Sequence, residues 1–332
     1  VGKYNIGVTA GIETTVCAGD WIEGMNRMDM NLVSSQHSKK VFEITQFEKK
    51  DKEKTVGHIK LEKPVEVLFE GLNLDTYKKL PPKEVSLDLS QIKESFCYLF
   101  VGHWMNGSYG HDRKNVGLLV KSFLETFKNQ KNKPALILKA SIGSSSYTSR
   151  EALLKRIDAL KKTVNSSNLP NIYIMNGDLS DQEINELYNH PKVKAMVSLT
   201  KGEGFGRPLL EFSSIGKPII ASGWSGQVDF LHKEKTFLLG GELEQVHESA
   251  ANKWILKESK WFKPDLNIIG SVLKDMFKNY KNYVVKGKQQ GHYSRTNFSF
   301  DKMTELLGTY LEKYVNVPAE VELQLPILEK ID

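Results

Sequence analysis

Three glycines and a glutamate lie between an apolar run and a helix-like pattern in "VSLTKGEGFGRPLLEFSSIGKPIIAS", residues 197–222. A glycine-rich turn lets backbone N–H groups approach a phosphate at a helix N-terminus. The spacing of Gly202, Gly204 and Gly206 is one residue short of a dinucleotide-binding loop, and Glu203 would repel a dianion there. Because an ionised carboxylate accepts hydrogen bonds well from sugar hydroxyls, we expect Glu203 to contact a neutral polyhydroxylated group.

A second carboxylate, Glu211, follows eight positions after Glu203. We expect it in the first turn of a helix that begins near Pro208 and ends before Gly216. Both carboxylates can then face one crevice, where the backbone N–H groups of residues 204–206 add donors for a diphosphate. Two plainer interpretations stay open: Glu211 complements the helix dipole, and Glu203 is a solvated loop residue.

The loop "GHWMNGSYGHDRKN", residues 102–115, brings cations to a predicted helix start. Asp112 is suited to cap that helix, yet Arg113 and Lys114 follow at once, where the helix dipole disfavours positive charge. A bound anion would remove this conflict; the alternative is that both side chains point to water. His103 and His111 are in principle metal ligands, but no cysteine or acidic cluster beside them in the sequence completes a metal site.

The elements that position these loops alternate between strands and helices. The pattern predicts buried strands at residues 95–102, 134–141, 171–177, 192–200 and 217–222. It predicts helices at residues 112–130, 149–164 and 180–188, the last opened by a capping box of Ser180 and Glu183. Strands and helices at this interval predict a parallel, doubly wound α/β sheet, which binds ligands outside the carboxyl ends of its strands.

The first 90 residues show a shorter version of the same alternation. Strands are predicted at residues 4–10, 30–35 and 64–71, and helices at 20–28 and 34–50, with Asp20 and either Ser34 or Ser35 as caps. The lysine-rich residues 48–58 are expected to form an exposed loop, and residues 79–90, with Pro81 and Pro82, a linker.

These patterns predict three regions. Residues 1–90 form a partial N-terminal lobe, and residues 91–285 form a C-terminal ligand-binding domain. Residues 286–332 form a C-terminal helix and tail that pack back on the N-terminal lobe. Helical patterns cover residues 266–285 and 300–315.

The composition is typical of a globular protein: of 332 residues, 40% are hydrophobic and 26% charged. A net charge of +6 with scattered lysines favours anionic ligands in general and nucleic acid only weakly. Cys17 and Cys97 have no metal-ligand spacing, so we expect two buried thiols and a cytoplasmic location. The sequence shows no membrane-spanning run and no signal peptide, but it begins with Val1, so removal of a leading segment stays open.

Three segments of the sequence resemble motifs of a known protein family. "KGEGFGRPLLEFSSIGKPIIAS" resembles the Glu, seven residues, Glu signature of the family-4-type retaining glycosyltransferases, which have the two-lobed GT-B fold. "YLFVGHW" with "DRKNVGLLVKSF" resembles their phosphate-binding strand, loop and helix, and "YIMNGDLSDQEINELY" resembles the segment that follows. The similarity covers about residues 96–231, while residues 9–42 resemble the second half of the family's N-terminal domain. The first half of that domain is absent, through truncation or divergence.

The resemblance implies an α/β GT-B fold of two Rossmann-like lobes with parallel sheets, the N-terminal lobe being short or truncated. It implies that Glu203 binds hydroxyls of the donor hexose, that Glu211 binds the ribose, and that Lys114, aided by Arg113, holds the diphosphate. The family usually has an arginine where this chain has His103, so Arg113 or Lys139 is expected to substitute. The other expected substrate-binding residues are Gly102, His103, Lys139, Asn176, Gly204, Phe205, Gly206, and His37 and Glu13 on loops of the N-terminal lobe.

The implied function is retaining transfer of a hexose from a nucleotide diphosphate sugar to a hydroxyl of a glycan, lipid or other acceptor. No cofactor is implied, and no metal, since the sequence lacks a D-x-D motif. Three alternatives stay open: a phage-type enzyme that glucosylates DNA, a sugar-nucleotide epimerase, and a catalytically silent sugar-nucleotide-binding subunit. Peripheral membrane contact and the oligomeric state also stay open.

Overall fold

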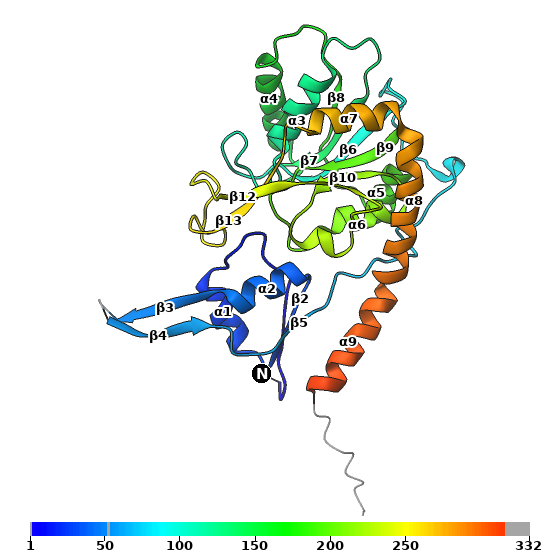
Figure 1. Cartoon of the computed structure of the whole chain (residues 1–332). Helices are drawn as coiled ribbons and strands as arrows, with labels where there is room; N and C mark the ends of the chain where they lie inside the picture. Colours follow the sequence, from blue (N-terminus) through cyan, green and yellow to red (C-terminus); the bar gives the residue numbers. More distant parts are fainter. Residues whose placement is uncertain (1, 52–53, 316–332) are drawn as a thin grey trace, which may run out of the picture.

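The computed structural model describes residues 2–51 and 54–315. It has two lobes, each built on a parallel sheet (Figure 1). The sheet of the C-terminal lobe has six strands in the order β11-β10-β9-β6-β7-β8, and every neighbouring pair is parallel. Its strands are β6 (Cys97–His103), β7 (Ala135–Ser141), β8 (Ile172–Met175), β9 (Val193–Ser198), β10 (Ile219–Ser222) and β11 (Phe237–Leu239).

Helices cover both faces of this sheet, because successive side chains of each strand point to opposite faces. In β6, Tyr98 and Phe100 pack in the core under one set of helices, while Cys97 and Leu99 pack under the other. The helices are α3 (Val116–Phe127), α4 (Tyr147–Lys162), α5 (Asp181–Asn189), α6 (Arg207–Ser214), α7 (Ile269–Lys278) and α8 (Tyr280–Asn297). This confirms the doubly wound α/β sheet and the capping box of Ser180 and Glu183. The pattern at residues 266–285 divides into two helices at Asn279.

The strand order reverses between β6 and β9. After β6 the chain adds β7 and β8 on one side, and it then returns to place β9, β10 and β11 on the other. At such a switch point the loops after the two adjacent strands diverge and leave a crevice at their carboxyl ends. The loops after β6 and β9 are the two that carry the predicted chemistry.

The N-terminal lobe has a parallel sheet of three strands in the order β1-β2-β5. Its strands are β1 (Ile6–Thr9), β2 (Met30–Val33) and β5 (Val65–Val67), and its helices are α1 (Gly19–Asn26) and α2 (Gln36–Ile44). Ser35 caps α2 by accepting a hydrogen bond from the backbone of Ser38, as predicted. The predicted Asp20 cap is wrong, since α1 begins one residue earlier and Asp20 lies in its first turn.

The segment after α2 differs from the sequence expectation. The helix ends at Ile44, and the chain then forms an antiparallel hairpin of β3 (Gln46–Asp51) and β4 (Lys54–Lys60). Phe47 lies opposite Ile59 in this hairpin, between polar neighbours, which is the alternation of a half-exposed strand. The predicted exposed loop at residues 48–58 is therefore wrong for the described part; residues 52 and 53 lie outside it.

Two connections join the lobes. The linker contains only a short 3-10 helix, η1 (Pro82–Glu84), as its prolines predict. The helix α9 (Phe300–Tyr314) runs back to the N-terminal lobe, where the Tyr310 hydroxyl donates to the carbonyl of Val67 at 2.9 Å (Figure 1). The rest of the predicted tail, residues 316–332, lies outside the described residues, and the division of the chain at residues 90 and 285 stays a prediction.

A two-stranded arm projects from the C-terminal lobe toward the N-terminal lobe (Figure 1). It consists of β12 (Gly241–Gln245) and β13 (Lys260–Pro264), which pair antiparallel. The backbone of Thr15 donates to the carbonyl of Lys260 at 2.9 Å, and the backbone of Lys260 donates to Oγ1 of Thr15 at 2.9 Å. The arm therefore fixes the loop that follows β1.

Both cysteines, Cys17 and Cys97, are buried free thiols, as predicted. Within residues 2–51 and 54–315, no helix has the length and apolar character needed to span a membrane.

Candidate functional site

The start of α3 places two cations ahead of the helix rather than inside it. The helix begins at Val116, so the predicted start at Asp112 is wrong by four residues. Asn115, in the left-handed conformation with φ 57°, is the N-cap residue, while Oδ2 of Asp112 accepts a hydrogen bond from the backbone of Val116 at 3.1 Å. Arg113 and Lys114 thus lie in the loop before the helix, and their side chains are not directed by the geometry of its first turn.

The side chains of these cations meet Glu203 from the glycine loop. Nζ of Lys114 donates to both carboxylate oxygens of Glu203, at 2.6 and 2.7 Å. Nη1 of Arg113 lies 3.3 Å from Oε2 of Glu203 and donates to the carbonyl of Gly202 at 2.8 Å. The anion that neutralises Arg113 and Lys114 in this structure is therefore a side chain of the same chain.

The N-terminal lobe adds a fourth charge to this cluster. Oε1 of Glu13, on the loop after β1, lies 3.5 Å from Nη2 of Arg113. The side chain of Glu13 is 30% exposed, whereas those of Arg113, Lys114 and Glu203 are exposed by only 10 to 13%. The four groups form a charge cluster of two acids and two bases at the boundary of the lobes, and we call it the interlobe cluster.

Burial and neighbouring charge act in opposite directions on Glu203. Burial raises the pKa of its carboxyl, but the nearby Lys114 and Arg113 outweigh burial and hold that pKa below its ordinary value. Glu203 is therefore ionised at neutral pH. Because Glu203 is buried and ionised, loss of its hydrogen-bond donors would leave an uncompensated buried charge, which is strongly unfavourable.

The glycines of the loop let the two lobes touch. A Cβ atom on Gly202 would lie 1.9 Å from the carbonyl oxygen of Glu13, and one on Gly204 would lie 2.2 Å from that of Ala10. Only glycine fits at such distances. Gly206, with φ 98°, then starts α6 in a left-handed conformation that also favours glycine.

Glu211 lies in a separate polar group. It is the fifth residue of α6, which begins at Arg207, and so lies just past the predicted first turn; its Oε1 accepts from Nε of Arg207 at 2.8 Å. Its Oε2 accepts from the Tyr188 hydroxyl at 3.2 Å. Burial raises the pKa of Glu211, although Arg207 opposes that shift. Its partners, Arg207 and Tyr188, differ from those of Glu203, and the prediction that both carboxylates face one crevice stays a prediction.

Four predicted residues lie at the carboxyl ends of β6, β7 and β8. Nδ1 of His103, the residue after Gly102, lies 2.8 Å from Oγ of Ser141. Nζ of Lys139 donates to the carbonyl of Gly177 at 2.6 Å, and Nδ2 of Asn176 donates to the carbonyl of Ala140 at 3.1 Å. The ammonium of Lys139 is thus bound to a backbone carbonyl rather than to a carboxylate of the interlobe cluster.

His37 lies in the first turn of α2, not in a loop as expected. Its ring packs edge-on against Trp224, with 4.6 Å between the ring centroids. Burial lowers the pKa of His37 to about 4, although the backbone of Thr14 opposes that shift. His37 is therefore neutral at pH 7 and faces the C-terminal lobe. Phe205, also predicted at the site, is buried against Phe230.

The glycine loop also holds a buried cation that was not predicted. Lys201 is 1% exposed, and its ammonium contacts Glu244 of the arm and lies 5.5 Å from the ring centroid of Trp261. The backbone of Phe262 also donates to the carbonyl of Lys201 at 2.8 Å. The motif "TKGEG" does indicate such a residue, because a lysine directly after a buried strand needs a partner for its charge. The sequence does not identify that partner, since Glu244 lies 43 residues later.

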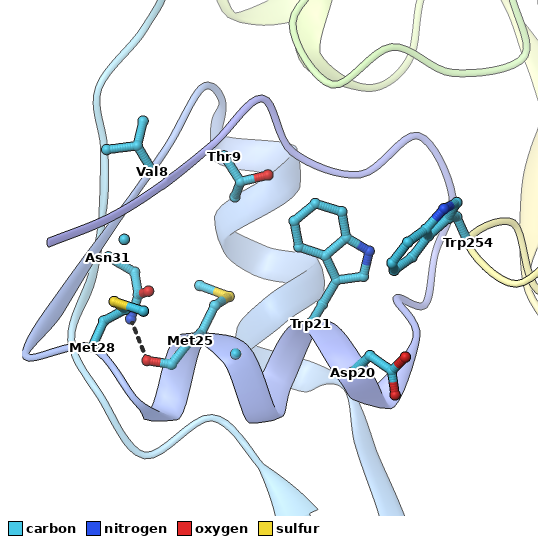
Figure 2. Close-up of a pocket in the computed structure, with 10 residues that line it drawn as sticks. Val8, Thr9, Asp20, Trp21, Met25, Met28, Asn31 and Trp254 are labelled. Carbon is cyan, nitrogen blue, oxygen red and sulfur yellow. Dashed lines mark hydrogen bonds between the residues drawn. The ribbon is translucent and has the colours of Figure 1, made fainter.

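The described residues also form an open apolar pocket of about 230 Å³ on the N-terminal lobe (Figure 2). Trp21, Met25 and Met28 line it from α1 and the turn after it, and Trp254 reaches it from the loop between β12 and β13. Trp21 and Trp254 contact edge-on, with 5.6 Å between their ring centroids. The pocket contains none of the residues of the interlobe cluster.

Residues 111–260 match the family model described as glycosyl transferases group 1. Among proteins with curated functions, none matches the chain in sequence. Among solved structures, the chain is similar to sucrose-phosphate synthase from Thermosynechococcus elongatus, with a TM-score of 0.61 and 16% identity over 88% of this chain and 60% of that chain.

Two further solved structures give the same result. HepE of Anabaena in complex with UDP and glucose has a TM-score of 0.59 and 15% identity over 89% of this chain and 66% of that chain. A glycosyltransferase from Rickettsia africae has a TM-score of 0.62 and 16% identity over 94% of this chain and 71% of that chain. The likeness shows the GT-B fold, and the chain spans 60 to 71% of the length of these three structures.

Proposed function

Starting from a glycosyl transferases group 1 domain at residues 111–260, we propose that this chain transfers a hexose from a nucleotide diphosphate sugar to a hydroxyl acceptor. The observation that supports this most is the interlobe cluster, in which Lys114 and Arg113 lie with Glu203 at the switch point of the sheet. A crevice at this position is where doubly wound sheets bind nucleotides. HepE, which shares the fold, is described with UDP and glucose.

In this proposal the residues divide the donor between them. Lys114 and Arg113 bind the diphosphate and stabilise the negative charge that develops on it as the sugar leaves. Glu203 accepts hydrogen bonds from the hexose hydroxyls, and Glu211 accepts them from the ribose. The backbone N–H groups at the start of α6, from Gly206 onward, add partial positive charge.

The proposed reaction retains the configuration at the anomeric carbon and uses neither a metal ion nor a cofactor. Two cations beside the diphosphate supply the charge stabilisation that a metal ion otherwise provides. Contact between the lobes at Gly202 and Gly204 excludes water from the reacting atoms. The acceptor is a glycan, a lipid or another hydroxyl compound, and the protein acts in the cytoplasm.

The experiment that tests this proposal is a donor panel. UDP-, GDP- and ADP-sugars are each incubated with the protein, and sugar release or transfer is followed by NMR, which also reports the anomeric configuration of the product. We expect turnover with one base and retention of configuration. No hydrolysis or transfer with any donor, together with a ligand-induced rise in melting temperature, would favour a silent binding subunit instead.

A further inference from the structure

The interlobe cluster is electrically balanced before any ligand enters. Glu13 and Glu203 carry two negative charges, and Arg113 and Lys114 carry two positive charges. A diphosphate that enters this cluster meets cations that a buried carboxylate already holds at 2.6 and 3.3 Å. From this geometry we propose that Glu203 competes with the diphosphate for Lys114 and Arg113, and that the sugar of the donor relieves this competition. The inference rests on the proposed function of the same site.

The competition follows from the hydrogen-bond needs of Glu203. Its side chain is 10% exposed, and Lys114 donates to both of its carboxylate oxygens. When Lys114 turns to a phosphate oxygen, Glu203 loses its main donor and keeps a buried charge, which is strongly unfavourable. A hexose supplies new O–H donors to the carboxylate, whereas a nucleoside diphosphate without a hexose supplies none at Glu203, because its ribose hydroxyls pair with Glu211 in the proposed arrangement.

This exchange gives the site a preference for donor over product. With a nucleotide sugar bound, Lys114 pairs with phosphate and Glu203 pairs with hexose hydroxyls. After transfer the hexose has left, so Glu203 returns to Lys114 and the nucleoside diphosphate is released. Glu203 therefore acts as a specificity residue that disfavours the nucleotide product.

The test measures binding of inorganic pyrophosphate, which needs neither the correct base nor any turnover. Glu203→Gln keeps the size of the side chain and an oxygen that accepts from Lys114, but removes the charge. We expect isothermal titration calorimetry to show at least about tenfold tighter binding of pyrophosphate to this variant than to the wild type. Glu234→Gln, which removes an exposed acid remote from the cluster, is the matched control and leaves the affinity unchanged.

A second comparison uses UDP, which has no hexose, and UDP-glucose, which carries a hexose on the same diphosphate. The wild type is expected to bind UDP-glucose more tightly than UDP, and Glu203→Gln is expected to lose about tenfold of this preference. If Glu203→Gln does not fold, Glu13→Gln removes the outer acid of the same cluster and is expected to strengthen pyrophosphate binding in the same direction.

Unchanged or weaker pyrophosphate binding in folded Glu203→Gln, or in folded Glu13→Gln if it must be used, overturns the inference. Failure of the proposed transfer reaction is a separate result, because it is read from turnover. A protein that transfers no sugar but binds pyrophosphate more tightly after Glu203→Gln supports the competition and contradicts the proposed function alone.

Discussion

Lys114 is the residue whose surroundings differ most from what its position in the sequence indicates. It follows Asp112 and Arg113 at a predicted helix start, yet its ammonium lies 2.6 Å from a carboxylate 89 residues later in the chain. That carboxylate belongs to the glycine loop, so the structure brings the two loops into direct contact. From the sequence, Glu203 is expected to bind a sugar and Lys114 a phosphate. In the structure these two side chains bind each other.

At the residue scale, we predict that Lys114→Ala weakens the binding of a nucleoside diphosphate at least about tenfold more than that of the nucleoside. The ammonium is the donor nearest to the proposed diphosphate position, and the nucleoside lacks the charge it recognises. Calorimetry with both ligands checks this. Lys121→Ala is the control, since Lys121 lies on α3 and pairs with Glu125 at the surface. Equal losses for the two ligands would return Lys114 to a structural role.

At the element scale, Glu66 joins β5 and α2 of the N-terminal lobe to the C-terminal helix α9. The carboxylate at the centre of β5 lies 2.9 Å from Nζ of Lys39 on α2, and 3.0 Å from Nζ of Lys313 on α9. The Tyr314 hydroxyl donates to it at 2.6 Å. Burial raises the pKa of Glu66, but these partners outweigh burial and lower that pKa to about 2.

The lowered pKa of Glu66 gives a prediction about acid stability. Because the folded-state pKa is below the unfolded-state value, the contribution of Glu66 is fully present above about pH 4.5 and is lost as the pH falls toward about 2. We expect a contribution on the order of 1 kcal/mol, reduced because the pairs lie close to solvent. Urea unfolding of wild type and Glu66→Gln at pH 7 and pH 3 measures it.

The stability difference between wild type and Glu66→Gln should shrink at pH 3. The control is Glu305→Gln. Glu305 is an exposed acid on α9, and it pairs with Lys302 of the same helix. A constant difference between wild type and Glu66→Gln across this pH range would show that Glu66 does not hold α9 through its charge.

At the scale of the whole molecule, the lobes meet through the glycine loop, the arm and α9. Gly204 accepts a hydrogen bond from Oγ of Ser34 at 3.2 Å, and Oδ2 of Asp229 accepts one from the backbone of Gln36 at 2.8 Å. These contacts hold the glycine loop and the segment around Asp229 against α2 and the turn before it. The interlobe cluster is therefore formed by residues of both lobes.

We predict that transfer or donor hydrolysis persists in excess EDTA. Within the described residues, no group of three or more His, Cys, Asp or Glu side chains is arranged to hold a metal ion. Arg113 and Lys114 supply the positive charge at the proposed diphosphate position. The check is turnover with and without EDTA, and then with added Mn²⁺ or Mg²⁺. Activity that disappears in EDTA and returns with metal would make Glu203 a candidate metal ligand.

The sequence alone determined the doubly wound sheet and the start of α6. Periodicity and capping are local, so strands β6 to β10 and a cap of α2 at Ser34 or Ser35 were predictable from a few neighbouring residues, whereas β11, β12 and β13 were not predicted. The predicted helix at residues 34–50 was too long. It ends at Ile44, and Phe47 instead pairs with Ile59 in the hairpin, a partner that local periodicity does not indicate.

Only the tertiary structure decided which charges meet. The pairing of Lys114 with Glu203, of Glu13 with Arg113 and of Lys201 with Glu244 depends on strand order and on the contact between lobes, and the sequence spacing of each pair carries no information about it. Charge attraction acts over a few ångströms in space, whereas these partners lie 43 to 100 residues apart along the chain, so the fold had to bring them together before their chemistry could be assigned.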